Sequence, residues 1–321
     1  MTRTAAALAL LLAIAAPANA ETSPPDTDGA AARESLAALQ RDDARLLAIG
    51  WRLTTGNAAY CEGTRPAIGL LLQDMAGYAD PATMRAVAGI AGDFAVQAVA
   101  PDSPAAYAGL RPNGEVESID GTALAGLPAG EAPDWRRLVQ VHAMIERSLA
   151  EDGNVAVEGP TGSIKLAGTP ACPGRFEVTE GDRAVADGTR VVIGRDFAGF
   201  DRPDDELAAA VAHELAHNLL AHRAWLDPRG RKRRDIRVTE QEADRLSPWL
   251  LANAGYPPDA ALRFMRAWGP RHGGGLLRKR THAGWDERAE TIAAEIARVE
   301  AARGDDGSAD WSRHFVREIA P

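Results

Sequence analysis

With 321 residues, 45% of them hydrophobic and 25% charged, the chain has the composition of a globular protein and not of a fibrous or disordered one. A formal net charge of -9 at pH 7 argues against nucleic acid as the main partner, because phosphate binding requires a net basic surface. The basic run at residues 229–234 is the local exception, and we interpret it as a solvated loop between two helices.

The first twenty residues are predicted to be a cleavable signal peptide. Arg3 precedes an apolar stretch at residues 5–16 that is too short to span a bilayer, and Ala18, Asn19 and Ala20 form a small-x-small cleavage site. The residue directly after this site is Glu21 and not the Cys that would carry a lipid anchor. No later segment reaches about eighteen apolar residues in a row. We therefore expect a periplasmic or secreted protein without a transmembrane segment or lipid anchor, whose membrane association is at most peripheral.

The chain contains two cysteines, Cys61 and Cys172. In an oxidising compartment an isolated pair favours a disulfide, and closing so long a loop stabilises by roughly 4 to 5 kcal/mol in the chain-entropy model. The alternative is two separate buried thiols. The spacing excludes a CxxC redox site and a cysteine zinc cluster.

The N-terminal half is predicted to alternate between helices and β structure. Leucines at helical spacing indicate an amphipathic helix over residues 31–54. Short apolar alternations broken by Pro, Gly and Asp indicate β structure over residues 95–124. A helix at 134–150 and a second β-like stretch at 154–167 are expected to follow.

Part of this β-rich region resembles PDZ domains. The sequences SPAAYAGL at residues 103–110 and GEVESIDG at residues 114–121 carry the resemblance. It implies a module that binds peptides by adding them as a strand to a sheet edge. However, Glu115 stands where PDZ domains usually have Asp, and no carboxylate-binding loop is evident near residues 90–92. Peptide binding and a role as a packed spacer both stay open.

The C-terminal half is predicted to begin with a strand and to continue as helices. The β-branched run at residues 191–193 is interpreted either as an edge strand that pairs with an extended peptide or as an ordinary core strand. A helix at 207–221 follows, with Asp204 and Asp205 as candidate N-caps. Further helices are expected at 238–254, 260–268 and 287–302, with a Gly-Tyr-Pro-Pro turn at 255–258.

The helix at 207–221 contains the pattern H-E-x-x-H. Residues four apart share one helix face, so His213 and His217 can bind one zinc ion. Glu214 lies about 100° around the helix and can address a water bound to that ion, so we predict that it is the general base. Burial of this helix by its apolar residues disfavours the alternative of a coincidental match on an exposed helix.

A catalytic zinc site needs a third protein ligand and an open position for water. The metzincin pattern is excluded, because Leu220 and Arg223 occupy the positions where it requires Gly and His. The sequence EQEAD on the following helix offers a glutamate instead. Glu240 and Asp244 lie one turn apart on one face, so Glu240 can bind zinc while Asp244 accepts a hydrogen bond from a ligand histidine. Glu242 is expected to point elsewhere.

At these residues the sequence resembles the M48 family of metallopeptidases, over roughly residues 170–300. The resemblance includes a strand before the helix, the lead-in at 204–208, H-E-x-x-H, E-x-x-A-D from Glu240, and the sequence AGYP at 254–257. It implies that Glu240 is the third zinc ligand and that the chain is similar to the soluble, exported members of the family. Arg183 stands where the family often has Asn.

The resemblance extends to Thr281-His282 and the downstream Arg288. It implies that His282 approaches the zinc, where it stabilises the developing oxyanion or plugs the open position; the alternative is a histidine in a surface loop. His222, nine residues after His213, is expected near the opposite face of the helix as a structural or exposed residue. No role is assigned to the remaining histidines, His142, His272 and His314.

Together these interpretations predict an α+β protein: a mainly helical gluzincin-type zinc protease domain with a small sheet, and an inserted β-rich PDZ-like module. One Zn²⁺ per chain, a polypeptide substrate and no nucleic acid are expected. The predicted activity is hydrolysis of peptide bonds in exported or misfolded envelope proteins. The expected order is a signal peptide at 1–20, an N-terminal helical segment packing on the protease domain at 21–79, a PDZ-like domain at 80–170 and an M48-like metalloprotease domain at 171–321.

Two other functions stay open on the sequence. A periplasmic PDZ-type binding or chaperone-like protein would carry a latent zinc site, but the joint presence of Glu214, both histidines and Glu240 argues against it. A zinc hydrolase that acts on a non-peptide substrate is the third alternative.

Overall fold

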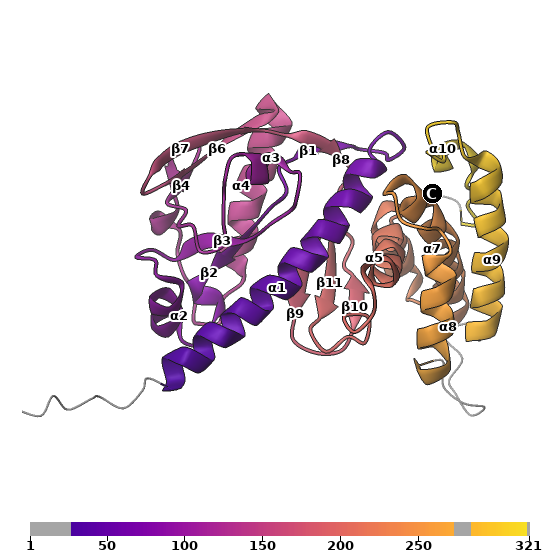
Figure 1. The fold of residues 1–321 in the computed structure, drawn as a ribbon, viewed down its shortest axis with the longest axis horizontal. Helices are drawn as coiled ribbons and strands as arrows, with labels where there is room; N and C mark the ends of the chain where they lie inside the picture. Colours follow the sequence, from indigo (N-terminus) through magenta and orange to yellow (C-terminus); the bar gives the residue numbers. More distant parts are fainter. Residues whose placement is uncertain (1–26, 273–283, 320–321) are drawn as a thin grey trace, which may run out of the picture.

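The computed structural model describes residues 27–272 and 284–319, so the expected signal peptide lies outside the described residues. Figure 1 shows the long helix α1 (Thr27–Gly56) running diagonally between two parts of the molecule. We call residues 65–171 the β-rich unit and residues 175–319 the helical unit. The protein is α+β with small sheets, as predicted. Within the described residues, no helix combines the length and apolar composition that crossing a membrane requires.

The helices fall close to the predicted positions. Helix α1 extends the predicted range at both ends, and the four helices expected from residue 207 onward are all present. The helices after α1 are α2 (Pro81–Ala88), α3 (Pro104–Tyr107), α4 (Arg136–Asp152), α5 (Asp204–Leu219), α6 (His222–Leu226), α7 (Arg233–Asn253), α8 (Ala260–His272), α9 (Trp285–Ala302) and α10 (Trp311–His314).

The strands form small sheets in both units. In the β-rich unit, β2 pairs with β3, β1 pairs with β8, and a four-stranded sheet has the order β5-β4-β6-β7; in the helical unit, a three-stranded sheet has the order β10-β11-β9. The strands are β1 (Arg65–Ala67), β2 (Leu70–Asp74), β3 (Phe94–Val99), β4 (Ser118–Ile119), β5 (Thr122–Ala123), β6 (Asn154–Gly159), β7 (Gly162–Ala167), β8 (Thr169–Ala171), β9 (Arg175–Thr179), β10 (Ala184–Ala186) and β11 (Arg190–Gly194).

Helix α1 contributes to the cores of both units. Leu46, Ile49 and Leu53 follow helical spacing and are buried in the core of the helical unit. Leu47 and Trp51 lie on a different face and pack against β2 and β3 of the β-rich unit. The helix is therefore buried along two stripes, which fits its position between the units in Figure 1.

The β-rich unit has its own apolar core between its strands and α4. Strands β1 and β2 precede residue 80, the expected start of the module, yet Ile68 and Leu72 pack in the same core as Phe94 and Ile145. A buried ion pair joins the beginning of α4 to β2, because Arg137 Nε lies 2.7 Å from a carboxylate oxygen of Asp74.

A disulfide connects the two ends of the β-rich unit. Cys61 follows α1 and Cys172 follows β8, and their Cα atoms are 5.6 Å apart. The predicted pairing is confirmed, and the alternative of two separate thiols is excluded. Because β1 pairs with β8 beside this bridge, both ends of the unit leave it at the same place.

Candidate metal centre

Helix α5 carries the H-E-x-x-H motif through the core of the helical unit, where it packs on α7, α8 and α1. Acidic residues in its first turn interact favourably with the helix dipole. The N-cap prediction for Asp204 and Asp205 was wrong, because Pro203 is the N-cap residue and no side chain caps the helix. The two aspartates instead form ion pairs with Arg45 and Arg263, which tie the start of α5 to α1 and α8.

The predicted zinc ligands from α5 and α7 lie together. His213 Nε2 and His217 Nε2 are 3.3 Å apart. The two carboxylate oxygens of Glu240 face one nitrogen each, with Oε2 3.5 Å from His213 Nε2 and Oε1 3.5 Å from His217 Nε2. Zinc bonds of about 2.1 Å at tetrahedral angles place ligand atoms roughly 3.4 Å apart, so these three residues fit a zinc ion. Their side chains are 14% to 19% exposed, which keeps the group within reach of solvent. Among the described residues, no other comparable group of His, Cys, Asp or Glu ligands occurs.

Glu214 lies next to these candidate ligands, and the pKa of its carboxyl group is raised. Burial raises the pKa of its carboxyl group to about 7, and the neighbouring His213 opposes the shift. The backbone N–H of Ala186 on β10 also faces the carboxylate and acts to lower its pKa. A pKa near the working pH suits a group that must take up and release a proton, and a bound cation would favour its ionised form.

Asp244 holds His213 from the side opposite the ligand nitrogen. His213 Nδ1 lies 3.1 Å from Asp244, so Nε2 is the nitrogen that faces His217 and Glu240. Arg288 on α9 forms a bidentate ion pair with Asp244 at 2.6 and 2.7 Å. Burial raises the pKa of Asp244, but Arg288 outweighs it, so the pKa is lowered and the carboxylate stays ionised. Burial lowers the pKa of His213, but Asp244 and Glu240 raise it to about 10, which shows how strongly this pocket favours a cation.

His222 lies against this group, where sequence reasoning did not place it. Helix α5 ends at Leu219, and Ala221 adopts a left-handed backbone with φ of 54°, which redirects the chain before α6. His222 Nδ1 thereby lies 2.9 Å from His217 Nδ1, and its Nε2 lies 3.1 Å from Glu242. The opposite-face prediction was wrong because it assumed one continuous helix. The left-handed residue, an alanine, gives no sequence signal for the break.

The small sheet of the helical unit presents the edge strand β10 beside Glu214. The order β10-β11-β9 places β11 in the centre, so the prediction of residues 191–193 as an edge strand was wrong and the core-strand alternative is confirmed. Val191 and Ile193 are fully buried. In contrast, Val185 on β10 is 47% exposed, and within the described residues β10 pairs with β11 alone.

Two predicted features of the site lie outside the described residues. Thr281 and His282 fall in the segment 273–283, so the role predicted for His282 stays a prediction. Arg288, which the resemblance places downstream of them, is described and contacts Asp244 as given above.

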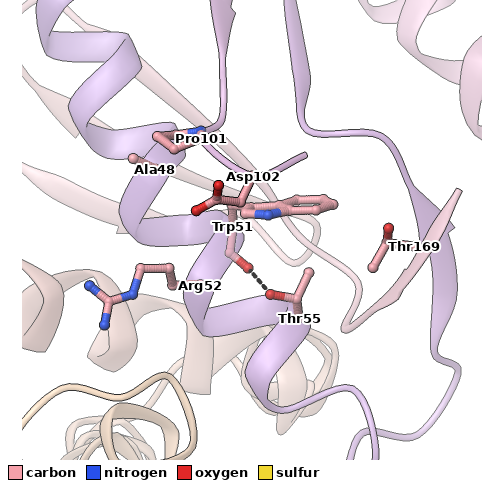
Figure 2. Close-up of a pocket in the computed structure, with 7 residues that line it drawn as sticks. All are labelled: Ala48, Trp51, Arg52, Thr55, Pro101, Asp102 and Thr169. Atoms are coloured by element: carbon pink, nitrogen blue, oxygen red, sulfur yellow. Dashed lines mark hydrogen bonds between the residues drawn. The ribbon is translucent and has the colours of Figure 1, made fainter. Parts of the chain in front are cut away.

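A separate pocket of about 340 Å³ lies on the surface of α1. Figure 2 shows its lining residues, with the Thr55 hydroxyl donating to the Trp51 carbonyl one turn earlier at 2.7 Å. None of the predicted site residues lines it, so the candidate chemistry lies at the histidine cluster. The lining consists of Ala48, Trp51, Arg52, Thr55, Pro101, Asp102 and Thr169.

A scan against protein-family models gives no match to this chain, and a search of curated proteins gives none either. The functional interpretation therefore depends on the geometry of the site and on its sequence motifs.

Proposed function

We propose that this protein is a zinc-dependent endopeptidase of the M48 kind. The observation that carries the proposal is the close spacing of the Nε2 atoms of His213 and His217 and the carboxylate of Glu240, which fits a tetrahedral zinc site. Two histidines and one glutamate leave a fourth position for water or substrate, as catalytic zinc sites do. Glu214 beside them supplies a general base.

Zinc, when bound at these three residues, would polarise a carbonyl group and lower the pKa of a water molecule. The chain's own residues then have separate tasks. Glu214 takes up a proton with its carboxylate and returns it to the leaving amine. His217 stays neutral at pH 7, because burial lowers its pKa to about 3, so that Nε2 remains a ligand. Arg288 holds Asp244 in place and lies 3.8 Å from the Glu240 carboxylate.

The edge strand β10 supports a polypeptide as the substrate. Among the described residues β10 pairs with β11 alone, so its other edge can offer backbone N–H and C=O groups to an extended chain, which is a common mode of peptide binding. Helix α5 packs on β10 and the backbone N–H of Ala186 faces the Glu214 carboxylate, so this edge lies close to the proposed base. A non-peptide substrate would make no use of a strand edge. The disulfide, together with the signal-like N-terminal sequence, supports substrates among exported or misfolded envelope proteins.

The β-rich unit fits the spacer alternative better than peptide capture. The backbone N–H groups of Ala91 and Gly92, in the segment where a carboxylate-binding loop was sought, donate to the side chain of Glu115. These donors are already paired within the chain. We therefore assign the chemistry to the helical unit and a supporting role to the β-rich unit.

Cleavage of casein by the chain from Glu21 onward tests this function, with bound zinc counted in the same sample. Zinc near one per chain and cleavage that is lost on chelation and regained with added Zn²⁺ are expected. Glu214→Gln is the matched control: it should keep its zinc and lose roughly 10²- to 10⁴-fold in turnover. Absence of zinc from the wild-type chain would contradict the proposal, and zinc without cleavage of any unfolded protein would favour the latent-site alternative.

A further inference from the structure

A hydrogen-bonded path leads from His217 to the end of the chain. His217 Nδ1 lies 2.9 Å from Nδ1 of His222, and His222 Nε2 lies 3.1 Å from Oε2 of Glu242. The side chains of His222 and Glu242 are 1% and 0% exposed, so water cannot replace these partners. Buried polar groups of this kind are costly unless every contact is made.

The C-terminal segment supplies the remaining contacts of Glu242. Its Oε1 accepts hydrogen bonds from the backbone N–H groups of Glu318 and Ile319, the latter at 3.0 Å. Its Oε2 lies 3.2 Å from the guanidinium of Arg317, which also donates to the Leu220 carbonyl at 2.9 Å. Both carboxylate oxygens therefore face donors from residues 317–319.

These contacts determine the direction of every hydrogen bond in the path. Since Glu242 acts only as an acceptor, Nε2 of His222 must carry its proton. Nδ1 of His222 is then an acceptor, and Nδ1 of His217 donates to it. The electron pair of His217 is thereby placed on Nε2, the atom that lies 3.3 Å from Nε2 of His213. Asp244 orients His213 directly, through one contact to its Nδ1.

We propose that the C-terminal segment 317–319 is a positioning part of the metal centre, which fixes the orientation and tautomer of His217 through Glu242 and His222. This inference depends on the proposed function, because it concerns how the same residues hold zinc. Partners that orient a histidine ligand typically contribute 10- to 100-fold to metal affinity. The segment would thus influence zinc binding without touching the ion.

Glu242→Gln is the most direct test, because it reverses the donor and acceptor roles along the path. The amide NH₂ of the new side chain donates to Nε2 of His222, so the proton moves to Nδ1 of His222 and then to Nε2 of His217, where it blocks the ligand atom. We expect zinc affinity, measured by competition with a chromophoric chelator, to fall by about 10- to 100-fold. The ¹⁵N shifts of the His217 ring should show the exchanged tautomer.

Arg317→Ala removes one contact of Glu242 from a partly exposed position and should weaken zinc binding by a smaller factor, with Arg317→Lys restoring part of it. Arg313→Ala is the matched control: it also removes an arginine near the C-terminus, but that side chain is 81% exposed and pairs with Asp310, outside the path. The control should bind zinc like the wild type. Thermal unfolding of the zinc-free proteins identifies any variant that is merely unfolded.

Two outcomes separate this inference from the proposed function. If the wild-type chain binds no zinc, the proposed function itself fails. If the wild-type chain binds zinc and folded Glu242→Gln and Arg317→Ala bind it equally well, the positioning role of the C-terminal segment is overturned. Should Glu242→Gln fail to fold, the zinc affinity of Arg317→Ala relative to Arg313→Ala decides alone.

Discussion

The β-rich unit and the helical unit both bury charged side chains, but they do so with different consequences. In the β-rich unit, Arg137 faces the carboxylates of Asp74 and Asp93, so the buried charges satisfy one another. In the helical unit, Asp244 and Glu242 each face an arginine and a histidine. The histidine at Asp244 is a candidate metal ligand itself, and the histidine at Glu242 contacts the other candidate. Buried charged side chains alone therefore do not indicate a functional site. They do indicate a candidate site when they contact histidines that belong to a solvent-accessible cluster.

The largest expected effect is on activity, which should depend on residues of the helical unit and not on those of the β-rich unit. His213→Ala and Glu240→Ala each remove one proposed zinc ligand, so bound zinc should disappear and cleavage should fall to the level of the chelated protein. The free energy of unfolding, measured with chelator present, should change far less. Equal zinc loss in Glu214→Gln would contradict the roles assigned here, because that residue is placed as the base and not as a ligand.

Loss of the disulfide should have the largest effect on stability. Replacing both Cys61 and Cys172 with Ala opens a loop of more than a hundred residues, and the chain-entropy model gives a loss of about 4 to 5 kcal/mol. Urea unfolding of the variant and of the oxidised wild type measures this difference. Because the bridge closes the β-rich unit, zinc affinity of the folded variant should remain unchanged; a large loss of zinc affinity would show that the two units are coupled.

Breaking the buried ion pair of the β-rich unit tests whether its charges are purely structural. Asp74→Ala leaves Arg137 with Asp93 alone in a buried position, and removing one partner of such a pair costs about 3 to 5 kcal/mol. Arg136→Ala is the control, because that neighbouring side chain is 74% exposed and should contribute less than about 1 kcal/mol. Unfolding by urea provides the measurement. Unchanged stability in Asp74→Ala would overturn this interpretation.

His142 should make the β-rich unit sensitive to acid. Burial lowers its pKa to about 3, and its Nε2 has no hydrogen-bond partner within the described structure. The unfolded chain, with a His pKa of about 6.5, binds the proton first, so stability is full above that pH and falls as the pH decreases towards about 3. Between pH 6.5 and pH 5 the loss should reach about 2 kcal/mol.

His142→Phe removes this titration while filling the space. In the variant, the free energy of unfolding in urea should fall by about 2 kcal/mol less between pH 6.5 and pH 5 than in the wild type. An identical slope in the wild type and the variant would show that His142 does not titrate between these states.

Sequence reasoning found the parts of the site that depend on helical periodicity. His213, His217, Glu240 and Asp244 follow from residues three and four apart on two regular helices, and the structure places these side chains together. The contact of His222 depends on a break in the helix at Ala221, which nothing in the local composition indicates.

Contacts between distant residues were not predictable. The hydrogen bonds from residues 317–319 to Glu242 join positions more than seventy residues apart, and no local pattern encodes them. The central position of β11 was not predictable for the same reason. Its β-branched composition suits an edge strand and a central strand equally well, and only the pairing with β9 and β10 decides between them.

The shared helix α1 also limits how this architecture can be divided or recombined. Leu46 and Leu53 complete one core while Leu47 and Trp51 complete another, so a cut on either side of the helix would leave an apolar surface uncovered. Neither unit could be transferred to another protein without a copy of α1. The β-rich unit is therefore not an exchangeable module, and substitutions on one stripe of α1 are constrained by those on the other.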